Sequence, residues 1–144
     1  MPQVHELATV PRDNEIVRVP ILVARALYDF AVDGGAVSTI NLMPSAALPS
    51  GALVLAAFLN VITVPTSGGA ATISVETEAA GDLQSAAAIS GAPWSSTGWK
   101  AATKTFATAP IKLTAARNIR MTIGTAALTA GKFEVIVFYL PPGL

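Results

Sequence analysis

The sequence of 144 residues contains no cysteine, a single histidine and few charged side chains. Without cysteine, neither a disulfide bond nor a thiolate metal site can form, so the fold must rest on packing alone. The sole histidine, His5, excludes a metal site with several histidine ligands, and its place in the N-terminal arm argues against a nucleophile relay through histidine. We expect the side chain of His5 to be solvated.

The distribution of apolar residues predicts neither a secretory signal nor a transmembrane helix. The first twenty residues lack the basic segment followed by an apolar segment that a secretory signal requires. The longest apolar run, residues 52–64, spans 13 positions. A membrane-spanning helix needs roughly 20 apolar residues, so no membrane partner is expected.

Charged residues make up 12% of the chain, against about 25% in an average domain. Nine basic and nine acidic residues cancel, which removes the attraction that non-specific nucleic-acid binding requires, so we expect no nucleic-acid partner. Residues 34–75 form a span of 42 positions without one Asp, Glu, Lys or Arg. Because free-standing domains keep contiguous apolar patches small, this span indicates surface covered by partners. The alternative is a neutral polar surface of Ser, Thr, Asn and Gly.

The two halves of the chain carry opposite charge. Residues 1–90 contain three basic and eight acidic groups, whereas residues 91–144 contain six basic and one acidic. This asymmetry favours subunits that meet through opposite faces. The alternative is that strands from the two halves interleave in one domain and mix the signs.

Short runs of β-forming residues between turn signals predict an all-β chain. Residues 1–20 carry three prolines and no periodicity, so we expect an extended N-terminal arm followed by a single β-sandwich domain over residues 21–144. Asp33-Gly34-Gly35 predicts a tight hairpin between two strands. The apolar run 52–64 predicts a strand buried between layers, with a bulge or bend at Asn60.

Alanine, a strong helix former, occupies 27 positions, yet only residues 82–88 look helical, with Asp82 as the N-cap. Elsewhere 11 Gly, 10 Pro and 14 Thr interrupt the pattern. Later strands are expected around Thr105 and over residues 111–113, 119–123 and 133–140, with turns at 115–118 and 130–131. About eight strands in all predict a β-sandwich of the jelly-roll type, which closes most of its edges.

Three pairs of carboxylates lie two or four positions apart in the sequence: Asp13 and Glu15, Asp29 and Asp33, and Glu76 and Glu78. Glu76 and Glu78 would share one face of a strand, as in an acid pair or a calcium site, but such a site needs several more oxygen ligands from a defined loop. Asp33 before two glycines is explained by turn chemistry. We therefore assign no catalytic, cofactor-binding or metal-binding residue, and predict no cofactor and no enzymatic activity.

Trp94 and Trp99 lie in a loop rich in Gly and Ser, residues 91–100. Two aromatic side chains in such a loop can form a stacking platform for a sugar ring. The alternative is that they anchor the loop to the core or to a neighbouring subunit, since tryptophan is enriched at interface hot spots. No flanking Asp, Asn or Gln supplies hydrogen bonds to a sugar, which favours anchoring.

Two stretches carry a resemblance to a known group of proteins. ALYDFAVDGGAV at residues 26–37 and ALTAGKFEV at residues 127–135 resemble small virion proteins of tailed bacteriophages. The chain looks like a head decoration, or cement, protein. The resemblance implies a β-sandwich or jelly-roll body, commonly assembled as a homotrimer, that binds the outer surface of the icosahedral capsid across joints between major capsid protein subunits. It brings no catalytic residue and no cofactor.

These observations predict a structural virion protein, made in the host cytoplasm, that decorates and stabilises the capsid by bridging major capsid protein subunits. Such a protein binds by adding buried area at joints that the shell leaves weak, and many modest contacts sum to tight attachment. The alternative is a receptor-binding or glycan-binding knob of a tail fibre, or a carbohydrate-binding module. That alternative requires Trp94 and Trp99 to be exposed on one face.

Overall fold

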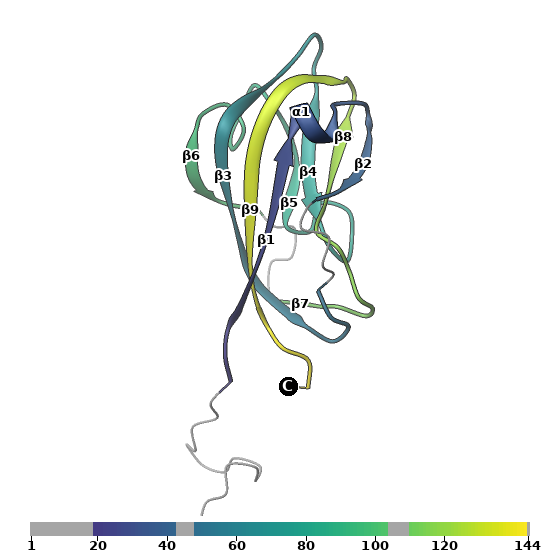
Figure 1. Ribbon diagram of the computed structural model, residues 1–144, viewed down its shortest axis with the longest axis vertical. Coiled ribbons are helices and arrows are strands. Elements are labelled where there is room, and N and C mark those ends of the chain that lie inside the picture. The colour runs from purple at the N-terminus through teal and green to yellow at the C-terminus, as the bar shows by residue number, and fades with distance from the viewer. Residues whose placement is uncertain (1–18, 43–47, 104–109, 144) are drawn as a thin grey trace, which may run out of the picture.

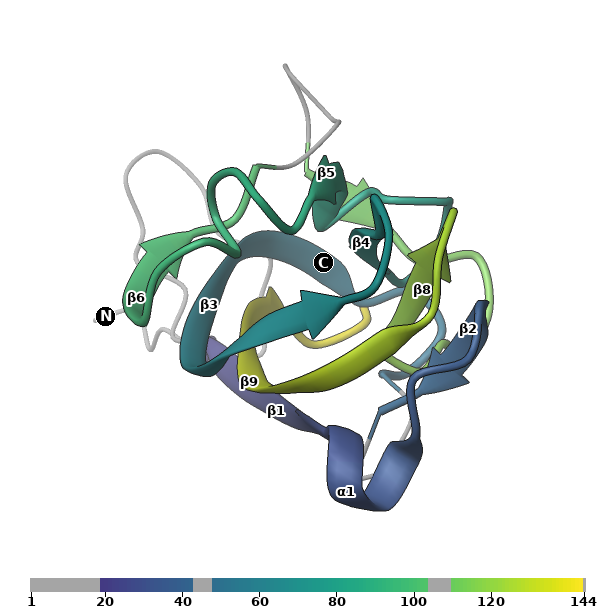
Figure 2. The same cartoon turned by 90° about the horizontal axis from the view of Figure 1, so that it is seen from above.

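Two antiparallel β-sheets packed face to face make up most of the structure (Figures 1 and 2). The computed structural model describes residues 19–42, 48–103 and 110–143. These residues form, in chain order, β1 (Leu22–Asp29), α1 (Phe30–Asp33), β2 (Ser38–Asn41), β3 (Leu53–Ser67), β4 (Thr72–Glu76), β5 (Gln84–Ala88), β6 (Gly98–Ala101), β7 (Ile111–Lys112), β8 (Arg120–Gly124) and β9 (Leu128–Leu140).

The strand order is that of a jelly roll. One sheet has the order β1-β9-β3-β6, with β7 also paired to β3, and the other has the order β2-β8-β4-β5. Consecutive strands belong to different sheets, except for β4 with β5 and β6 with β7. As a result, the β1–β2 segment lies antiparallel to the β8–β9 segment across both sheets. The predicted all-β sandwich is therefore confirmed.

The core lies between the two sheets and is built from alternate residues of each strand. In the five-stranded sheet, β9 contributes Phe133, Val135 and Val137, which are buried, while the residues between them point to the other face. Tyr28 and Trp94 pack on the ring of Phe133, with ring centroids 5.3 and 4.8 Å from it. The hydroxyl of Tyr28 donates a hydrogen bond to the carbonyl oxygen of Gly34 at 2.7 Å, so this buried polar group is satisfied.

The prediction of a hairpin at Asp33-Gly34-Gly35 is wrong, because the strands before and after it belong to different sheets. The Asp29 side chain caps a single helical turn by accepting a hydrogen bond from the backbone N–H of Ala31. The N–H of Gly34, with φ +77°, closes that turn on the carbonyl oxygen of Phe30. Gly34 and Gly35 therefore lie in a connection between the two sheets. The conformational freedom of glycine that would allow a tight hairpin also allows this connection.

The prediction of a helix over residues 82–88 is also wrong, because residues 84–88 form β5, which pairs with β4. Pairing with a neighbouring strand outweighs the helix propensity of alanine, since propensity is only a weak prior that tertiary context overrides. Asp82 is a cap, but of a turn: its carboxylate accepts hydrogen bonds from the backbone N–H groups of Thr77, Glu78 and Ala79, at 2.8 to 2.9 Å. The prediction that Asp82 is a capping residue is confirmed, but the element that it caps is a turn and not a helix.

The long central strand is irregular, as predicted, but not at Asn60. The register of β3 against β9 shifts between Val54 and Ala56 and again beyond Val61, whereas Asn60 stays opposite Glu134. The predicted turn at residues 130–131 is wrong, because β9 runs unbroken from Leu128 to Leu140.

Parts of two predictions lie outside the described residues. Of the expected N-terminal arm, only Val19 and Pro20 are described, and the strand expected around Thr105 is not described. Within residues 19–42, 48–103 and 110–143, no helix has the length and apolar character needed to cross a membrane.

Gly35 provides a test of the crossing between β1 and β2. A Cβ atom at this position would overlap the backbone carbonyl of Leu128 and lie 2.8 Å from a ring carbon of Phe30. We predict that Gly35→Ala lowers the free energy of unfolding by about 2 kcal/mol or more, as overpacking of a rigid site does. Gly68→Ala is the control, since a Cβ there meets no atom within 4 Å. Urea denaturation of both variants measures the difference, and equal stabilities would contradict this account of the crossing.

Candidate interaction surface

The five-stranded sheet has a second, outward surface that is largely apolar, which we call the outer face. Residues paired across neighbouring strands lie on the same face, so the register defines its rows. The rows are Val23–Phe138–Ala56, Arg25–Ile136–Phe58–Ala101 and Leu27–Glu134–Asn60–Trp99. The rings of Phe58 and Phe138 pack edge to face with centroids 5.6 Å apart. Aromatic and aliphatic side chains thus cover most of a surface that no other part of the described chain covers.

One carboxylate lies in the middle of this surface and is bound by its neighbours. Glu134 is buried, and its two oxygens accept hydrogen bonds from Arg25 Nε at 2.6 Å and from Asn60 Nδ2 at 3.0 Å. The hydrogen bond from Asn60, with a smaller effect from Arg25, lowers the pKa of Glu134 below its usual value. Because the charge is already paired within the chain, a partner can cover the face without isolating it.

The outward surface of the four-stranded sheet is different. Its rows contain Thr39, Thr122 and Ser74, then Asn41, Arg120 and Glu76. The hydroxyls of Thr39 and Thr122 lie 2.9 Å apart and share a hydrogen bond. The interpretation of a neutral polar surface therefore applies to the four-stranded sheet, whereas coverage of the apolar face by partners stays a prediction. The span supplies neutral polar residues to one sheet and, through β3, apolar residues to the other.

Exposed apolar side chains concentrate on the five-stranded sheet. Seven large apolar side chains are exposed among the described residues, and five belong to this sheet or directly precede its first strand: Ile21, Val23, Phe58, Ile62 and Trp99. The other two, Val32 and Val37, lie in α1 and just before β2. Exposed apolar side chains gathered on one sheet make it the candidate surface for protein association.

The two tryptophans have opposite environments. Trp94 is 0% exposed, packs on Phe133 and donates a hydrogen bond from Nε1 to the carbonyl oxygen of Ile73 at 3.3 Å. Trp99 is 59% exposed on β6, opposite Asn60. The interpretation of the pair as a shared sugar platform is wrong. Trp94 anchors its loop to the core, as the alternative interpretation predicted, whereas Trp99 lies on the outer face.

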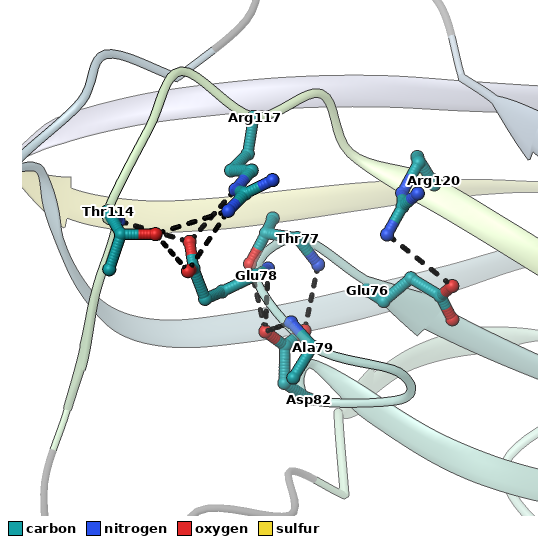
Figure 3. A network of polar contacts seen from close by, with 8 residues as sticks. All are labelled: Glu76, Thr77, Glu78, Ala79, Asp82, Thr114, Arg117 and Arg120. Carbon is teal, nitrogen blue, oxygen red and sulfur yellow. Dashed lines mark hydrogen bonds and ion pairs between the residues drawn. The ribbon is translucent and has the colours of Figure 1, made fainter.

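Glu76 and Glu78, which were singled out from the sequence, are both engaged within the fold (Figure 3). Glu76 accepts hydrogen bonds from Ser74, Thr122 and the N–H of Gly81. The carboxylate of Glu78 instead accepts hydrogen bonds from the guanidinium group of Arg117, at 3.0 and 3.2 Å, and from Thr114. These hydrogen bonds join the loop after β4 to the loop before β8. Glu76 and Glu78 therefore do not act as a pair.

Asp29 and Asp33 lie together at the end of β1. Asp33 accepts a hydrogen bond from the N–H of Asp29 at 2.9 Å, in agreement with the turn chemistry expected there. Asp13, Glu15 and His5 lie outside the described residues. In the part of the chain that the structure describes, no group of three or more His, Asp or Glu side chains is placed to hold a metal ion.

The charge asymmetry between the halves of the sequence is resolved inside the domain. Each of the four ion pairs among the described residues joins the first 90 residues to the rest of the chain: Arg25–Glu134, Arg117–Glu78, Arg120–Glu76 and Lys132–Asp29. Strands of the two halves alternate in the order β1-β9-β3-β6, and β8 lies between β2 and β4 in the other sheet, which brings the opposite charges together. This outcome matches the second interpretation, in which interleaved strands mix the signs.

Comparison with known proteins identifies relatives in structure only. No protein-family model matches the sequence, and no curated protein matches it. A chain of the cyanophage Pam1 capsid superposes with a TM-score of 0.64 and 20% identity, covering 99% of this chain and 100% of that one. A chain of the capsid of Ralstonia phage GP4 superposes with a TM-score of 0.59 and 18% identity, covering 96% of this chain and 94% of that one. A chain of the acid-stable capsid of Helicobacter pylori bacteriophage KHP30 superposes with a TM-score of 0.59 and 21% identity, covering 85% of this chain and 89% of that one. At these identities the likeness establishes a common fold.

The different roles of the tryptophans are testable by their effects on stability. We predict that Trp94→Ala lowers the free energy of unfolding by about 3–5 kcal/mol, the usual cost of removing a buried aromatic side chain. Trp99→Ala, at an exposed position, should change it by less than about 0.5 kcal/mol in the single chain. Guanidinium denaturation at low protein concentration measures both values. Similar losses for the two variants would contradict the assignment of Trp99 to an open surface.

Glu78 provides a test of the network in Figure 3. Hydrogen bonds from Arg117 and then from Thr114 lower the pKa of Glu78 from 4.5 to about 2. A carboxyl whose pKa is lower in the folded state stabilises the fold above its unfolded pKa and loses that effect as the pH falls. The loss should therefore occur between about pH 4.5 and pH 2. NMR titration of the carboxyl carbon should give a value near 2, and Arg117→Gln should move it toward 4.5; an unchanged value in the variant would refute this assignment.

Proposed function

We propose that this chain is a structural protein of a bacteriophage virion, one that decorates the capsid and stabilises it by bridging major capsid protein subunits. The observation that carries the proposal is the match to chains of three phage capsid structures, each over 85% or more of this chain. Jelly rolls serve many functions, so the fold alone does not assign this one. The surface of the molecule supplies the second part of the argument.

The outer face suits a protein that works by covering other proteins. It is apolar along three strands, and its central carboxylate is already paired with Arg25 and hydrogen-bonded by Asn60. Burial of apolar area is the main favourable term in protein association, at roughly 25 cal/mol per Å² removed from water. A protein repeated many times on a shell multiplies this contribution, because each added contact acts at high effective concentration.

The finer features of the proposal are those that the resemblance to head decoration proteins implies. We place the chain on the outer surface of the capsid, as a homotrimer, with the major capsid protein as its partner and with no enzymatic activity. A formal net charge of zero fits a protein that binds protein surfaces in preference to nucleic acid. The glycan-binding alternative loses its main support, since Trp94 is buried and cannot form a platform with Trp99.

The test uses the phage whose genome encodes this chain. We expect cryo-electron microscopy of its particles to show density for the jelly roll on the outside of the capsid, at joints between major capsid protein subunits. Particles made without the chain should disassemble at a lower temperature. Addition of the purified protein should restore the disassembly temperature of particles that contain it. The Trp94→Ala variant, which lacks a central core side chain, is the control and should not restore it. Density at the tail, or particles equally stable without the chain, would refute the proposal.

A further inference from the structure

Strand β1 forms one edge of the five-stranded sheet and, among the residues that the structure describes, pairs only with β9 (Figure 2). It has eight residues, no proline and no shift of register along its length. The other strands at sheet edges, β2, β5, β6 and β7, have five residues or fewer. Edge strands are usually protected by free charges, proline, a bulge or a covering segment. The two charged side chains of β1 are instead paired within the sheet, Arg25 with Glu134 and Asp29 with Lys132, so this long edge is poorly protected.

The register shows which backbone groups of β1 point away from the sheet. In an antiparallel sheet, the N–H and C=O groups of one residue point to the same neighbouring strand, and those of the next residue point to the opposite side. The carbonyl oxygen of Ala57 in β3 is hydrogen-bonded on the side of β6, so the backbone groups of Phe58 point to Ile136 in β9. Those of Ile136 point back to β3, and those of the preceding residue, Val135, point to Ala26 in β1. Alternate residues of β1 thus bind β9, and the residues between them point outward.

The outward residues of β1 are Val23, Arg25, Leu27 and Asp29. The fold closes this row at one end, because the N–H of Asp29 donates a hydrogen bond to the carboxylate of Asp33 in α1 at 2.9 Å. The backbone groups of Val23, Arg25 and Leu27 have no strand beside them in the part of the chain that the structure describes. These groups lie in the plane of the sheet, where a flat partner on the outer face would not reach them. An extended strand added at the edge would bind all of them.

The charge on β1 favours a strand from another protein over a second copy of this chain. In the antiparallel register that pairs all three open residues of two copies, Val23 lies opposite Leu27, and Arg25 lies opposite its own equivalent. Like charges directly opposite each other destabilise a sheet. The Arg25 side chain is 68% exposed, and Nε is the nitrogen that binds Glu134. A carboxylate on the added strand can therefore bind the other nitrogens of the guanidinium group, which makes the two strands complementary in charge.

We infer that an extended segment of the major capsid protein adds to the β1 edge as a further strand of the five-stranded sheet. The segment carries Asp or Glu opposite Arg25 and apolar side chains opposite Val23 and Leu27, so that it continues the rows of the outer face. Its backbone binds the open groups of β1, and these three side chains fix its register. This inference deepens the proposed function and rests on it, since it states how the shell holds the chain.

Hydrogen exchange measured residue by residue tests the added strand without any substitution. In the isolated protein, the amides of Val23, Arg25 and Leu27 should exchange rapidly, and those of Ala24 and Ala26, which bind β9, should exchange slowly. The protein is then bound to capsids made without this chain, exposed to heavy water, released and measured. Exchange of the three outward amides should slow by about tenfold or more, because each gains a hydrogen bond.

Two results of the exchange experiment would overturn the inference. The first is that the three outward amides still exchange rapidly in the capsid-bound protein. The second is that they already exchange slowly in the isolated protein, because another copy or another part of the same chain then occupies the edge.

Two substitutions of Val23 provide a second, matched test. Proline lacks the N–H group, and an edge strand tolerates it where that group points outward. Val23→Ala is the control, because it also shortens the side chain but keeps the N–H group. Val23→Pro should bind the same capsids about tenfold more weakly than Val23→Ala in co-sedimentation, since it loses a hydrogen bond and its ring obstructs the added strand. Both variants should keep the circular dichroism spectrum of the unmodified protein, and equal affinities of the two would overturn the inference.

Failure of the added strand and failure of the decoration role give different results. An unmodified protein that does not co-sediment with capsids at all refutes the proposed function, and the inference fails with it. A protein that binds capsids while its three outward amides stay unprotected refutes the inference alone and leaves the proposed function intact.

Discussion

The pairing of β9 with both β1 and β3 is the constraint on which the rest of the structure depends. Strand β9 spans 13 residues near the end of the chain, and the residues paired with it lie 61 to 117 positions earlier in the sequence. One side of β9 forms the core with Phe133, Val135 and Val137, and the other side forms the centre of the outer face. The core and the interaction surface therefore share one strand, and neither can form before the end of the chain is in place.

The outer face combines two properties that rarely occur together on the surface of an isolated domain. It is apolar over most of its area, yet it contains the buried carboxylate of Glu134 with two hydrogen-bond donors from neighbouring strands. A buried charge without partners would strongly oppose coverage by another protein. Because Arg25 and Asn60 donate hydrogen bonds to it, coverage of the face would not leave this carboxylate without a partner. This property suits a protein that is first made free and later assembles.

Sequence patterns predicted caps and turns more reliably than they predicted which strands pair with one another. Asp82 caps a turn and Asp29 caps a helical turn, as their side chains allow, but the first was predicted to begin a helix over residues 82–88. The glycines at 34 and 35 mark a change of direction, but the direction is toward the other sheet. A local pattern shows that the chain turns, whereas the strand it then pairs with is determined by residues far away in the sequence. The same limit applies to Trp94 and Trp99, which have similar sequence contexts and opposite exposures.

The sequence by itself determined the class of fold and the kind of surface. The alternation of β-forming residues between turns required strands, and the charge-free span required either partners or a neutral polar surface. Only the tertiary structure decided which strands pair, because jelly-roll pairing joins residues such as Leu22 and Tyr139 that no local pattern relates. It also placed Glu78 on Arg117 and Glu76 near Arg120, and it separated an apolar outer face from a polar one. The physical reason is that burial and pairing are properties of contacts between distant segments, and these contacts exist only once both sheets have formed.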